Sequence, residues 1–167
     1  MPPWDTWSAV DRATLVFVLR RDDVLLIRKL RGLGAGKING PGGRLEPGET
    51  AFECARREVQ EELRVTPLGL QQRGELRFQF VDGYSIHCFV FVAGGCDGDP
   101  QATEEAIPLW IPHNALPYAE MWADDRLWMP LMLEAKRFHG RFLFDGDTML
   151  EHELIVIDEP PQPRATV

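Results

Sequence analysis

The sequence has no long hydrophobic run and no sign of a targeting segment. No apolar run reaches the roughly 18 residues that a transmembrane helix needs. The first residues, Met1 to Trp7, contain neither a basic stretch nor an apolar one, so they do not resemble a signal peptide. We therefore expect a cytoplasmic protein that does not contact a membrane.

Positive charge is also scarce. Lysine and arginine total 18 against 26 aspartates and glutamates, which gives a net charge of -8 at pH 7. Proteins that bind long nucleic acids neutralise the phosphates with a basic surface, so this balance argues against such a ligand. A small nucleotide remains a suitable partner, because its phosphates arrive with divalent cations that an acidic site can bind.

The three cysteines are too few and too scattered for a disulfide framework or a zinc site. Cys54, Cys88 and Cys96 are odd in number and show no paired metal-ligand spacing. We interpret Cys54 and Cys88 as buried or half-buried thiols of a reducing compartment.

Length and composition predict one domain. Hydrophobic residues make up 44% of the chain, which is enough for a sizeable core. No repeat or linker divides the sequence, so we expect residues 1–167 to form a single domain and the protein to be a monomer. Residues 1–10 are expected to be a loose arm, and the proline-rich residues 159–167 a mobile tail.

The strongest pattern in the chain lies in residues 43–65. Thr50 and Glu53 form a capping-box pair, which predicts a helix from about Ala51 to Leu63. Apolar residues at helical spacing predict its buried face, which would comprise Phe52, Ala55, Val59 and Leu63.

Glutamates crowd one surface of this helix. Glu58, Glu61 and Glu62 are three or four residues apart, which places their carboxylates on one patch. Such a patch is costly unless a cation fills it, and oxygen ligands of this kind suit Mg²⁺ or Mn²⁺. Arg57 can hold a neighbouring carboxylate such as Glu49 through a charge-assisted hydrogen bond. An amphipathic helix with an exposed acidic face is the alternative interpretation.

A glycine-rich loop precedes the helix, and loop and helix together resemble a known signature. Gly40, Gly42 and Gly43 leave the backbone bare, so that it can approach a phosphate or lend a carbonyl to a metal. The stretch resembles the Nudix hydrolase signature G-x5-E-x7-R-E-U-x-E-E-x-G-U, where U is aliphatic. The matching positions are Gly43, Glu49, Arg57, Glu58, Val59, Glu61, Glu62 and Val65. Arg64 stands where the pattern has glycine, a position that usually supplies a left-handed helix cap.

This resemblance implies an α/β fold, the Nudix fold, in which a mixed β-sheet is sandwiched between helices (an α/β/α sandwich). The rest of the sequence agrees with such a fold. Strands are predicted as two hairpins, 14–20 with 24–29 and 74–81 with 84–93, and as single strands at 106–111, 142–144 and 149–157. A second helix is predicted at 122–138, with Leu127, Leu131 and Ala135 on one face. Pro130 implies that this helix starts late or kinks.

From about residue 14 to residue 158 the chain also resembles one branch of the family, which hydrolyses oxidised purine nucleoside triphosphates. The segments that carry this likeness are RGLGAGKINGPGG, LRFQFVDG, AEMWADDRLWMPLML, KRFHG and FLFDGDTM. The likeness implies a base pocket made by Asn39, Trp122, Asp124 and Asp125 and lined by Thr14, Lys29, Phe78 and Phe80. Leu33 and Ile38 replace aromatic residues of that branch.

Two carboxylates forced together share a proton, so one can donate to a base oxygen while the other accepts from a base N–H. Trp122 would offer the base a flat surface. The alternative, purely structural interpretations are that Asn39 is a turn residue before Gly40, and that Trp122 is a hydrophobic anchor before an acidic helix start.

The implied reaction is hydrolysis of a triphosphate to a nucleoside monophosphate and pyrophosphate. Mg²⁺, with Mn²⁺ as a possible substitute, would be held by Glu58, Glu61, Glu62, the Gly42 carbonyl and Glu105. Glu61 is favoured as the general base, Glu49 and Arg57 would support the cluster, and Lys29 or Arg44 would assist the leaving group. The alternatives are another Nudix substrate, such as a dinucleotide polyphosphate, ADP-ribose, a nucleotide sugar or a capped RNA end, and a non-catalytic nucleotide-sensing module.

Overall fold

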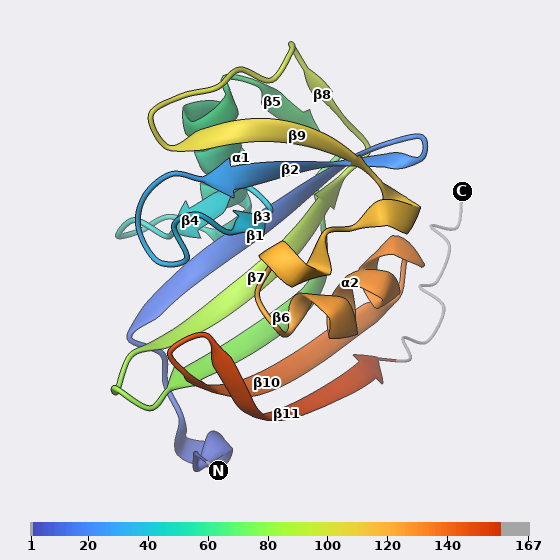
Figure 1. Cartoon of the computed structure of the whole chain (residues 1–167). Helices are drawn as coiled ribbons and strands as arrows, with labels where there is room; N and C mark the ends of the chain where they lie inside the picture. The colour runs from blue at the N-terminus through green and yellow to red at the C-terminus, as the bar shows by residue number, and fades with distance from the viewer. Residues whose placement is uncertain (1, 158–167) are drawn as a thin grey trace, which may run out of the picture.

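A mixed sheet forms the framework of the molecule (Figure 1). The computed structural model describes residues 2–157. The strands of the main sheet are β1 (Asp11–Arg20), β2 (Asp23–Lys29), β3 (Ile38–Asn39), β4 (Gly42–Arg44), β6 (Gln71–Phe80), β7 (Ser85–Ala93), β9 (Ala106–Pro112), β10 (Arg137–Asp145) and β11 (Thr148–Ile157). Their order is β11-β10-β6-β7-β1-β2-β3, with β4 paired to β1 and β9 paired to β2. Two short strands, β5 (Thr66–Leu68) and β8 (Gly95–Asp97), pair separately.

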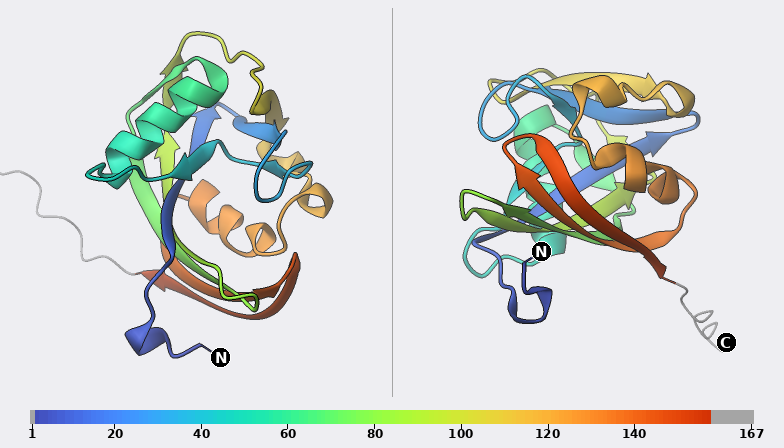
Figure 2. Two further views of the ribbon diagram at one scale, coloured as in Figure 1. Left: turned by 90° about the vertical axis from the view of Figure 1, so that its left-hand side faces the viewer. Right: turned by 60° about the horizontal axis from the view of Figure 1, so that its bottom comes forward.

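The two helices, α1 (Ala51–Leu63) and α2 (Asp125–Leu133), cover opposite faces of the sheet (Figure 2). Successive side chains of a strand point to opposite faces, so β1 serves both cores. Val16 and Val18 belong to the core under α1, whereas Phe17 belongs to the core under α2. The predicted α/β/α sandwich is therefore confirmed.

Helix α1 begins and ends where the capping pattern predicts. The Thr50 hydroxyl accepts a hydrogen bond from the Glu53 N–H, and the Glu53 carboxylate accepts one from the Thr50 N–H, both at 3.1 Å. At the other end Arg64 adopts the left-handed conformation, with φ of 60° and ψ of 29°. The cap geometry that glycine usually supplies is thus kept with an arginine.

The predicted buried face of α1 is right for Ala55, Val59 and Leu63 and wrong for Phe52. The Phe52 side chain is 49% exposed, while Cys54 and Glu62 are buried instead. The reason is that α1 packs against β4 as well as against β1, so the edge carrying Cys54 and Glu62 turns inward.

Both predicted hairpins are present, and their registers are well defined. Arg20 lies opposite Asp23 in the hairpin of β1 and β2, and Gln79 lies opposite Ser85 in that of β6 and β7. The strand predicted at 106–111 is β9, which pairs antiparallel with β2.

The second predicted helix is wrong at its C-terminal end. Helix α2 ends at Leu133, and Ala135 is exposed with a left-handed φ of 59°. The chain then enters β10, so this closing strand is longer than the predicted 142–144. Phe138 lies opposite Gly74 of β6, where a Cβ would overlap the phenyl ring. Strand pairing with a distant segment therefore overrides the helical periodicity.

The buried face of α2 also differs from the prediction. Trp128, Met129 and Met132 are buried, while Leu127 and Leu131 are only partly so. Helix α2 starts before Pro130, which lies inside it, so the proline does not delay the start, and the kink stays a prediction.

Three short 3₁₀ turns and the N-terminal arm complete the described chain. The turns are η1 (Trp4–Thr6), η2 (His113–Ala115) and η3 (Tyr118–Glu120). In the arm, the Trp7 indole N–H donates to the Gln79 side chain at 2.8 Å. The tail predicted at 159–167 lies outside the described residues. No helix within residues 2–157 has the length and apolarity to cross a membrane.

Candidate active site

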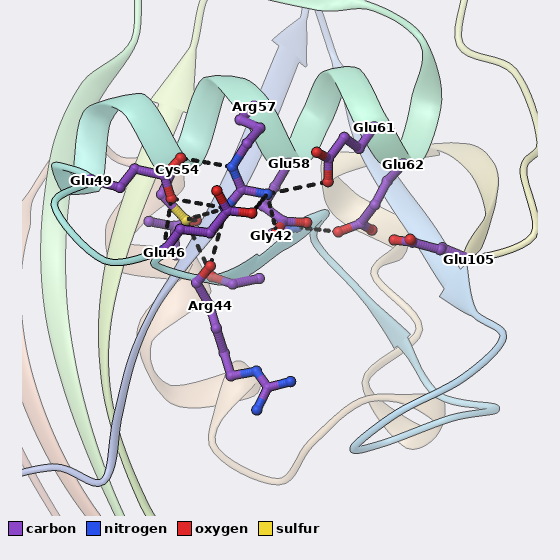
Figure 3. Close-up of polar contacts among 12 residues, drawn as sticks. Gly42, Arg44, Glu46, Glu49, Cys54, Arg57, Glu58, Glu61, Glu62 and Glu105 are labelled. Atoms are coloured by element: carbon purple, nitrogen blue, oxygen red, sulfur yellow. Dashed lines mark hydrogen bonds and ion pairs between the residues drawn. The ribbon is translucent and has the colours of Figure 1, made fainter.

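Three glutamate carboxylates converge beside the C-terminal half of α1 (Figure 3). One oxygen from each of Glu58, Glu62 and Glu105 lies within 4.8 Å of the others. We call these three residues the glutamate cluster. Glu62 is buried, and the Gly42 N–H donates to its Oε1 at 3.2 Å. Glu105 arrives from the loop before β9, so two distant segments build the cluster.

Burial raises the pKa values of two members of the cluster. It raises the pKa of Glu62 to about 8, and the neighbouring charge of Glu58 adds to the effect. Burial also raises the pKa of Glu58, although hydrogen bonds from Arg57 oppose it. Carboxylates at this spacing ionise together only when a cation compensates them. An all-oxygen donor set of this kind fits a hard divalent cation.

Arg57 connects the cluster to the loop before the helix (Figure 3). Its Nε and Nη2 donate to the two oxygens of Glu49 at 2.6 and 2.8 Å, a bidentate pair that lowers the pKa of Glu49 to about 2. Its Nη1 donates to Glu58 at 2.8 Å, and its Nη2 donates to the Arg44 carbonyl at 3.1 Å. Arg57 therefore fixes where the Glu58 carboxylate lies.

Glu61 lies at the edge of the cluster rather than within it. Its carboxylate accepts from Arg57 Nη1 at 3.1 Å, and its side chain is 52% exposed. The converging oxygens belong to Glu58, Glu62 and Glu105. The carboxylate patch expected from helical spacing is thus present, but Glu105 completes the cluster and Glu61 faces solvent beside it.

The two glycines of β4 leave no room for a side chain. A Cβ on Gly42 would overlap the carbonyl oxygen of Thr14, and one on Gly43 would lie 2.5 Å from the carboxyl carbon of Glu58. Gly43 pairs with Thr14 of β1. The backbone of β4 therefore fits closely between β1 and the glutamate cluster.

A cavity of about 430 Å³ opens next to the cluster, and we call it the base cavity. Its volume is typical of a small-ligand site. All residues predicted to bind substrate line it: Thr14, Lys29, Asn39, Gly42, Gly43, Arg44, Phe78, Phe80, Trp122, Asp124 and Asp125. Glu62 also lines it, so the base cavity is continuous with the glutamate cluster.

Asp124 and Asp125 form a buried acidic pair in the wall of the base cavity, each with only 2% of its surface exposed. The Trp128 indole N–H donates to Asp124 Oδ2 at 2.7 Å, and the Trp122 backbone N–H donates to Asp125 Oδ2 at 3.1 Å. The other oxygen of Asp124 is buried and has no hydrogen-bond partner among residues 2–157. A buried acceptor of this kind is a group that a bound ligand can satisfy.

Burial raises the pKa values of both aspartates. The pKa of Asp124 rises to about 6, and that of Asp125 rises well above its ordinary value because the Asp124 charge adds to burial. Two acids with raised, interacting pKa values hold one proton between them over a broad pH range. The pair can therefore donate one hydrogen bond and accept another.

Aromatic rings fix the position of the Trp122 indole. Its ring lies nearly perpendicular to Phe144, at 5.6 Å between centroids, and to Phe80, at 6.2 Å. On the loop before β3, a Cβ on Gly34 would lie 2.7 Å from the indole nitrogen. Phe78, which lines the base cavity, stacks on Phe142 of the core.

Two polar side chains of the base cavity, those of Lys29 and Asn39, have different surroundings. Burial lowers the pKa of Lys29, although the charges of Glu62 and Glu58 oppose this effect. Lys29 thus faces the glutamate cluster. The amide oxygen of Asn39 accepts from the Gly40 N–H at 2.8 Å, so Asn39 both lines the cavity and makes the local contact of a turn residue.

Sequence reasoning missed several residues of the base cavity. Ile86 and Cys88 of β7 line it, as does Tyr84, which lies one residue before the strand. Strand alternation groups these three, but only the packing of α2 shows which face borders a cavity. The Trp128 indole donates to Asp124, four residues earlier, and this helical spacing could have indicated the contact from the sequence.

The sequence and the fold both match known proteins. Residues 10–132 match the NUDIX domain. The chain is 42% identical over 148 residues to the oxidized purine nucleoside triphosphate hydrolase of Danio rerio, covering 87% of this chain and 95% of that protein. It is 40% identical over 147 residues to the Mus musculus protein of the same name, covering 87% and 94%. The crystal structure of a mutator MutT protein from Bacillus halodurans superimposes with a TM-score of 0.78 at 26% identity, covering 87% and 97%.

Proposed function

The chain belongs to the Nudix hydrolase family, and we propose that it hydrolyses oxidised purine nucleoside triphosphates, such as 8-oxo-dGTP and 2-oxo-dATP. The products would be the nucleoside monophosphate and pyrophosphate, and the reaction would remove damaged nucleotides before they enter DNA. One observation carries the proposal. The base cavity holds a buried acidic pair with an unpaired oxygen, and this cavity continues into a cluster of metal-binding carboxylates. The names of the two vertebrate relatives support it.

The aspartate pair suits the edge of an oxidised purine. In 8-oxoguanine a ring nitrogen that normally accepts a hydrogen bond carries a proton, and a new carbonyl lies beside it. Oδ2 of Asp124 already accepts from Trp128, so Oδ1 is left for a base N–H. Asp125, holding the shared proton, would donate to a base carbonyl. The indole of Trp122 would stack on the base, and Asn39, which also lines the cavity, would contact the polar edge of the base.

The glutamate cluster suits the triphosphate. Nudix hydrolases generally use divalent metal ions, and we propose Mg²⁺ here, with Mn²⁺ as a substitute. When bound, such ions polarise phosphate oxygens and lower the pKa of a bound water. Glu58, Glu62 and Glu105 would hold them, and the Gly42 carbonyl is a further candidate ligand.

The remaining residues would position the water and the phosphates. Glu61, exposed at the edge of the cluster, would take the proton of the attacking water, and Arg57 would orient Glu61 and Glu58 together. The water oxygen joins one phosphorus, the bridging bond between the α- and β-phosphates breaks, and the bridging oxygen leaves with the other product. Lys29 and Arg44 would offset the charge of the phosphates from within the base cavity.

The proposal is tested by measuring pyrophosphate release with Mg²⁺ across normal, oxidised and methylated purine nucleoside triphosphates. ADP-ribose and a dinucleotide polyphosphate serve as controls for other substrate classes of the family. We expect kcat/KM to be highest for an oxidised purine. Cleavage of a control compound without pyrophosphate release from any triphosphate would assign the enzyme to another class, and no turnover of any compound would favour a nucleotide-sensing module.

We also propose that the enzyme acts as a monomer in the cytoplasm. The three cysteines are free, and two of them are buried, which agrees with a reducing compartment. Gel filtration tests the oligomeric state, because a monomer elutes near 19.0 kDa.

A further inference from the structure

A second cavity, of about 390 Å³, adjoins the glutamate cluster, and we call it the outer cavity. Its lining comes from the loop after β2, the end of α1 and the loop before β9: Arg31, Glu61, Arg64, Gln101, Ala102, Thr103, Glu104 and Glu105. Glu105 belongs to both the outer cavity and the glutamate cluster, whereas Glu62 belongs to the cluster and the base cavity. The cluster therefore connects the two cavities.

Arg64 occupies the outer cavity from an unfavourable backbone position. Its φ is 60°, a left-handed conformation that crowds the Cβ of any residue other than glycine. Non-glycine residues keep such conformations mainly where another interaction compensates for the strain. Within residues 2–157, the Arg64 guanidinium makes no hydrogen bond or ion pair. The helix cap accounts for the backbone conformation, because the Arg64 N–H donates to the Gln60 carbonyl at 3.0 Å, and the guanidinium is left available for a ligand.

Arg31 brings a second guanidinium to the same cavity. Its Nη2 donates to Glu105 Oε1 at 3.1 Å, and its Nη1 lies 4.0 Å from Glu104. Because Glu105 is also a member of the cluster, the Arg31 guanidinium lies one carboxylate away from the oxygens that suit a metal. Both arginines thus border the end of the cluster that faces away from the base cavity.

We propose that Arg64, together with Arg31, binds the two terminal phosphates of the triphosphate and the pyrophosphate product. This inference rests on the function proposed above. A nucleotide with its base beside Asp124 and its first phosphate at the glutamate cluster must direct the rest of its phosphate chain out of the base cavity. The outer cavity is the hollow that adjoins the cluster there. Guanidinium groups bind phosphate oxygens through paired hydrogen bonds, and all the side-chain donors of Arg64 are available for them.

The substitution Arg64→Gly separates this role from a structural one. Glycine adopts the left-handed conformation freely, so the variant should unfold at a temperature no lower than the wild type. Its Kd for pyrophosphate, measured by calorimetry with Mg²⁺ present, should nevertheless rise by roughly tenfold. Inhibition of turnover by the nucleoside monophosphate should change much less, because that product binds in the base cavity.

Arg21→Gly is the matched control. Arg21 is also an exposed arginine with a left-handed backbone, with φ of 47°, but it lies in the turn between β1 and β2 and lines neither cavity. This variant loses the same charge and the same strain, so its Kd for pyrophosphate should equal that of the wild type.

The outcomes separate this inference from the proposed function. Equal pyrophosphate affinity in Arg64→Gly and the wild type would overturn the role of Arg64, as would an equal loss in Arg21→Gly, which would reduce the effect to net charge. If the wild type releases pyrophosphate from triphosphates while Arg64→Gly binds it normally, only this inference fails. If Arg64→Gly binds pyrophosphate weakly but the wild type cleaves no purine triphosphate, the phosphate site stands and the substrate assignment fails.

Discussion

Glu58 and Glu62 on α1 and the two aspartates at the start of α2 are all acids with raised pKa values, but their surroundings differ. Positive side chains reach the glutamates, since Arg57 donates to Glu58 at 2.8 Å and Lys29 faces the cluster. The hydrogen-bond donors to the aspartates are neutral, an indole N–H and a backbone N–H. The glutamates are thus arranged to stay charged around a cation, and the aspartates to share a proton. This difference supports the proposal that the first group acts in the chemistry and the second in recognition of the base.

The largest effect is expected from Glu62→Gln. The amide keeps the shape of the side chain but removes the charge that the cluster offers to a metal, so kcat should fall by roughly 100-fold or more. The melting temperature without metal should not decrease, because a buried carboxylate becomes neutral. Steady-state kinetics with Mg²⁺ and thermal unfolding measure both values. An unchanged kcat would remove the distinction between the two acidic groups.

Asp124→Asn should act on KM rather than on kcat. The variant turns a buried acceptor into a donor at the oxygen that has no partner, so KM for an oxidised purine triphosphate should rise by roughly tenfold. The dependence of kcat on Mg²⁺ concentration should stay that of the wild type. A loss of Mg²⁺ dependence here would mean that the aspartates belong to the metal site.

Trp128→Phe should have a smaller effect of the same kind. It removes the hydrogen bond that keeps Asp124 Oδ2 an acceptor, and this bond lowers the pKa of Asp124. We expect KM to rise by roughly fivefold and the pH at which KM changes to move upward. Met129→Ala is the control, because Met129 is equally buried on α2 and its loss costs packing only. The pH profile of KM should not move in that control.

The smallest expected effect is on the pH dependence of stability, to which the aspartate pair and the glutamate cluster should contribute in different pH ranges. Between the unfolded and folded pKa values of a buried acid, the folded protein binds more protons, so stability falls as the pH rises through that window. The window runs from 3.8 to about 6 for Asp124 and from 4.5 to about 8 for Glu62. The melting temperature of the metal-free protein should therefore drop by several degrees across both windows.

The two amide variants should flatten different parts of that curve. Glu62→Gln should remove the slope at the upper end, and Asp124→Asn should reduce it at the lower end. Added Mg²⁺ should restore the melting temperature at the alkaline end, where the glutamates are ionised. Calorimetry of the three proteins at matched pH values decides this, and identical slopes in all three would contradict the assigned pKa shifts.

The sequence predicts the glutamate side of the molecule better than the aspartate side for a physical reason. Helix α1 is specified locally, because the capping pair Thr50 and Glu53 and the helical spacing of the glutamates lie within one segment. The C-terminal end of α2 is not specified locally. Phe138 lies in β10 instead of the predicted helix, because it pairs with Gly74, more than 60 residues earlier in the chain. Local periodicity contains no information about such a partner.

The same reasoning explains the misjudged side chains. Phe52 fits the apolar period of α1, but the approach of the helix to β4 turns the Cys54 and Glu62 edge inward. Glu105 could be named as a metal ligand from the family motif, whereas its contact with Arg31 needs the folded loops. The roles of all these residues in catalysis stay predictions until the variants are measured.

The tight fit of β4 limits where substrate preference can be altered. A Cβ on Gly42 would overlap Thr14 and one on Gly43 would overlap the carboxylate of Glu58, so β4 has no room for larger residues beside the base cavity. A larger residue at Gly43 would therefore displace the carboxylate of Glu58. The part of the lining made by Leu33 and the start of α2 contains no residue of β4 or of the glutamate cluster. Substitutions meant to change the preferred nucleobase, and inhibitors meant to be selective, should therefore target Leu33 and the start of α2 in the base cavity.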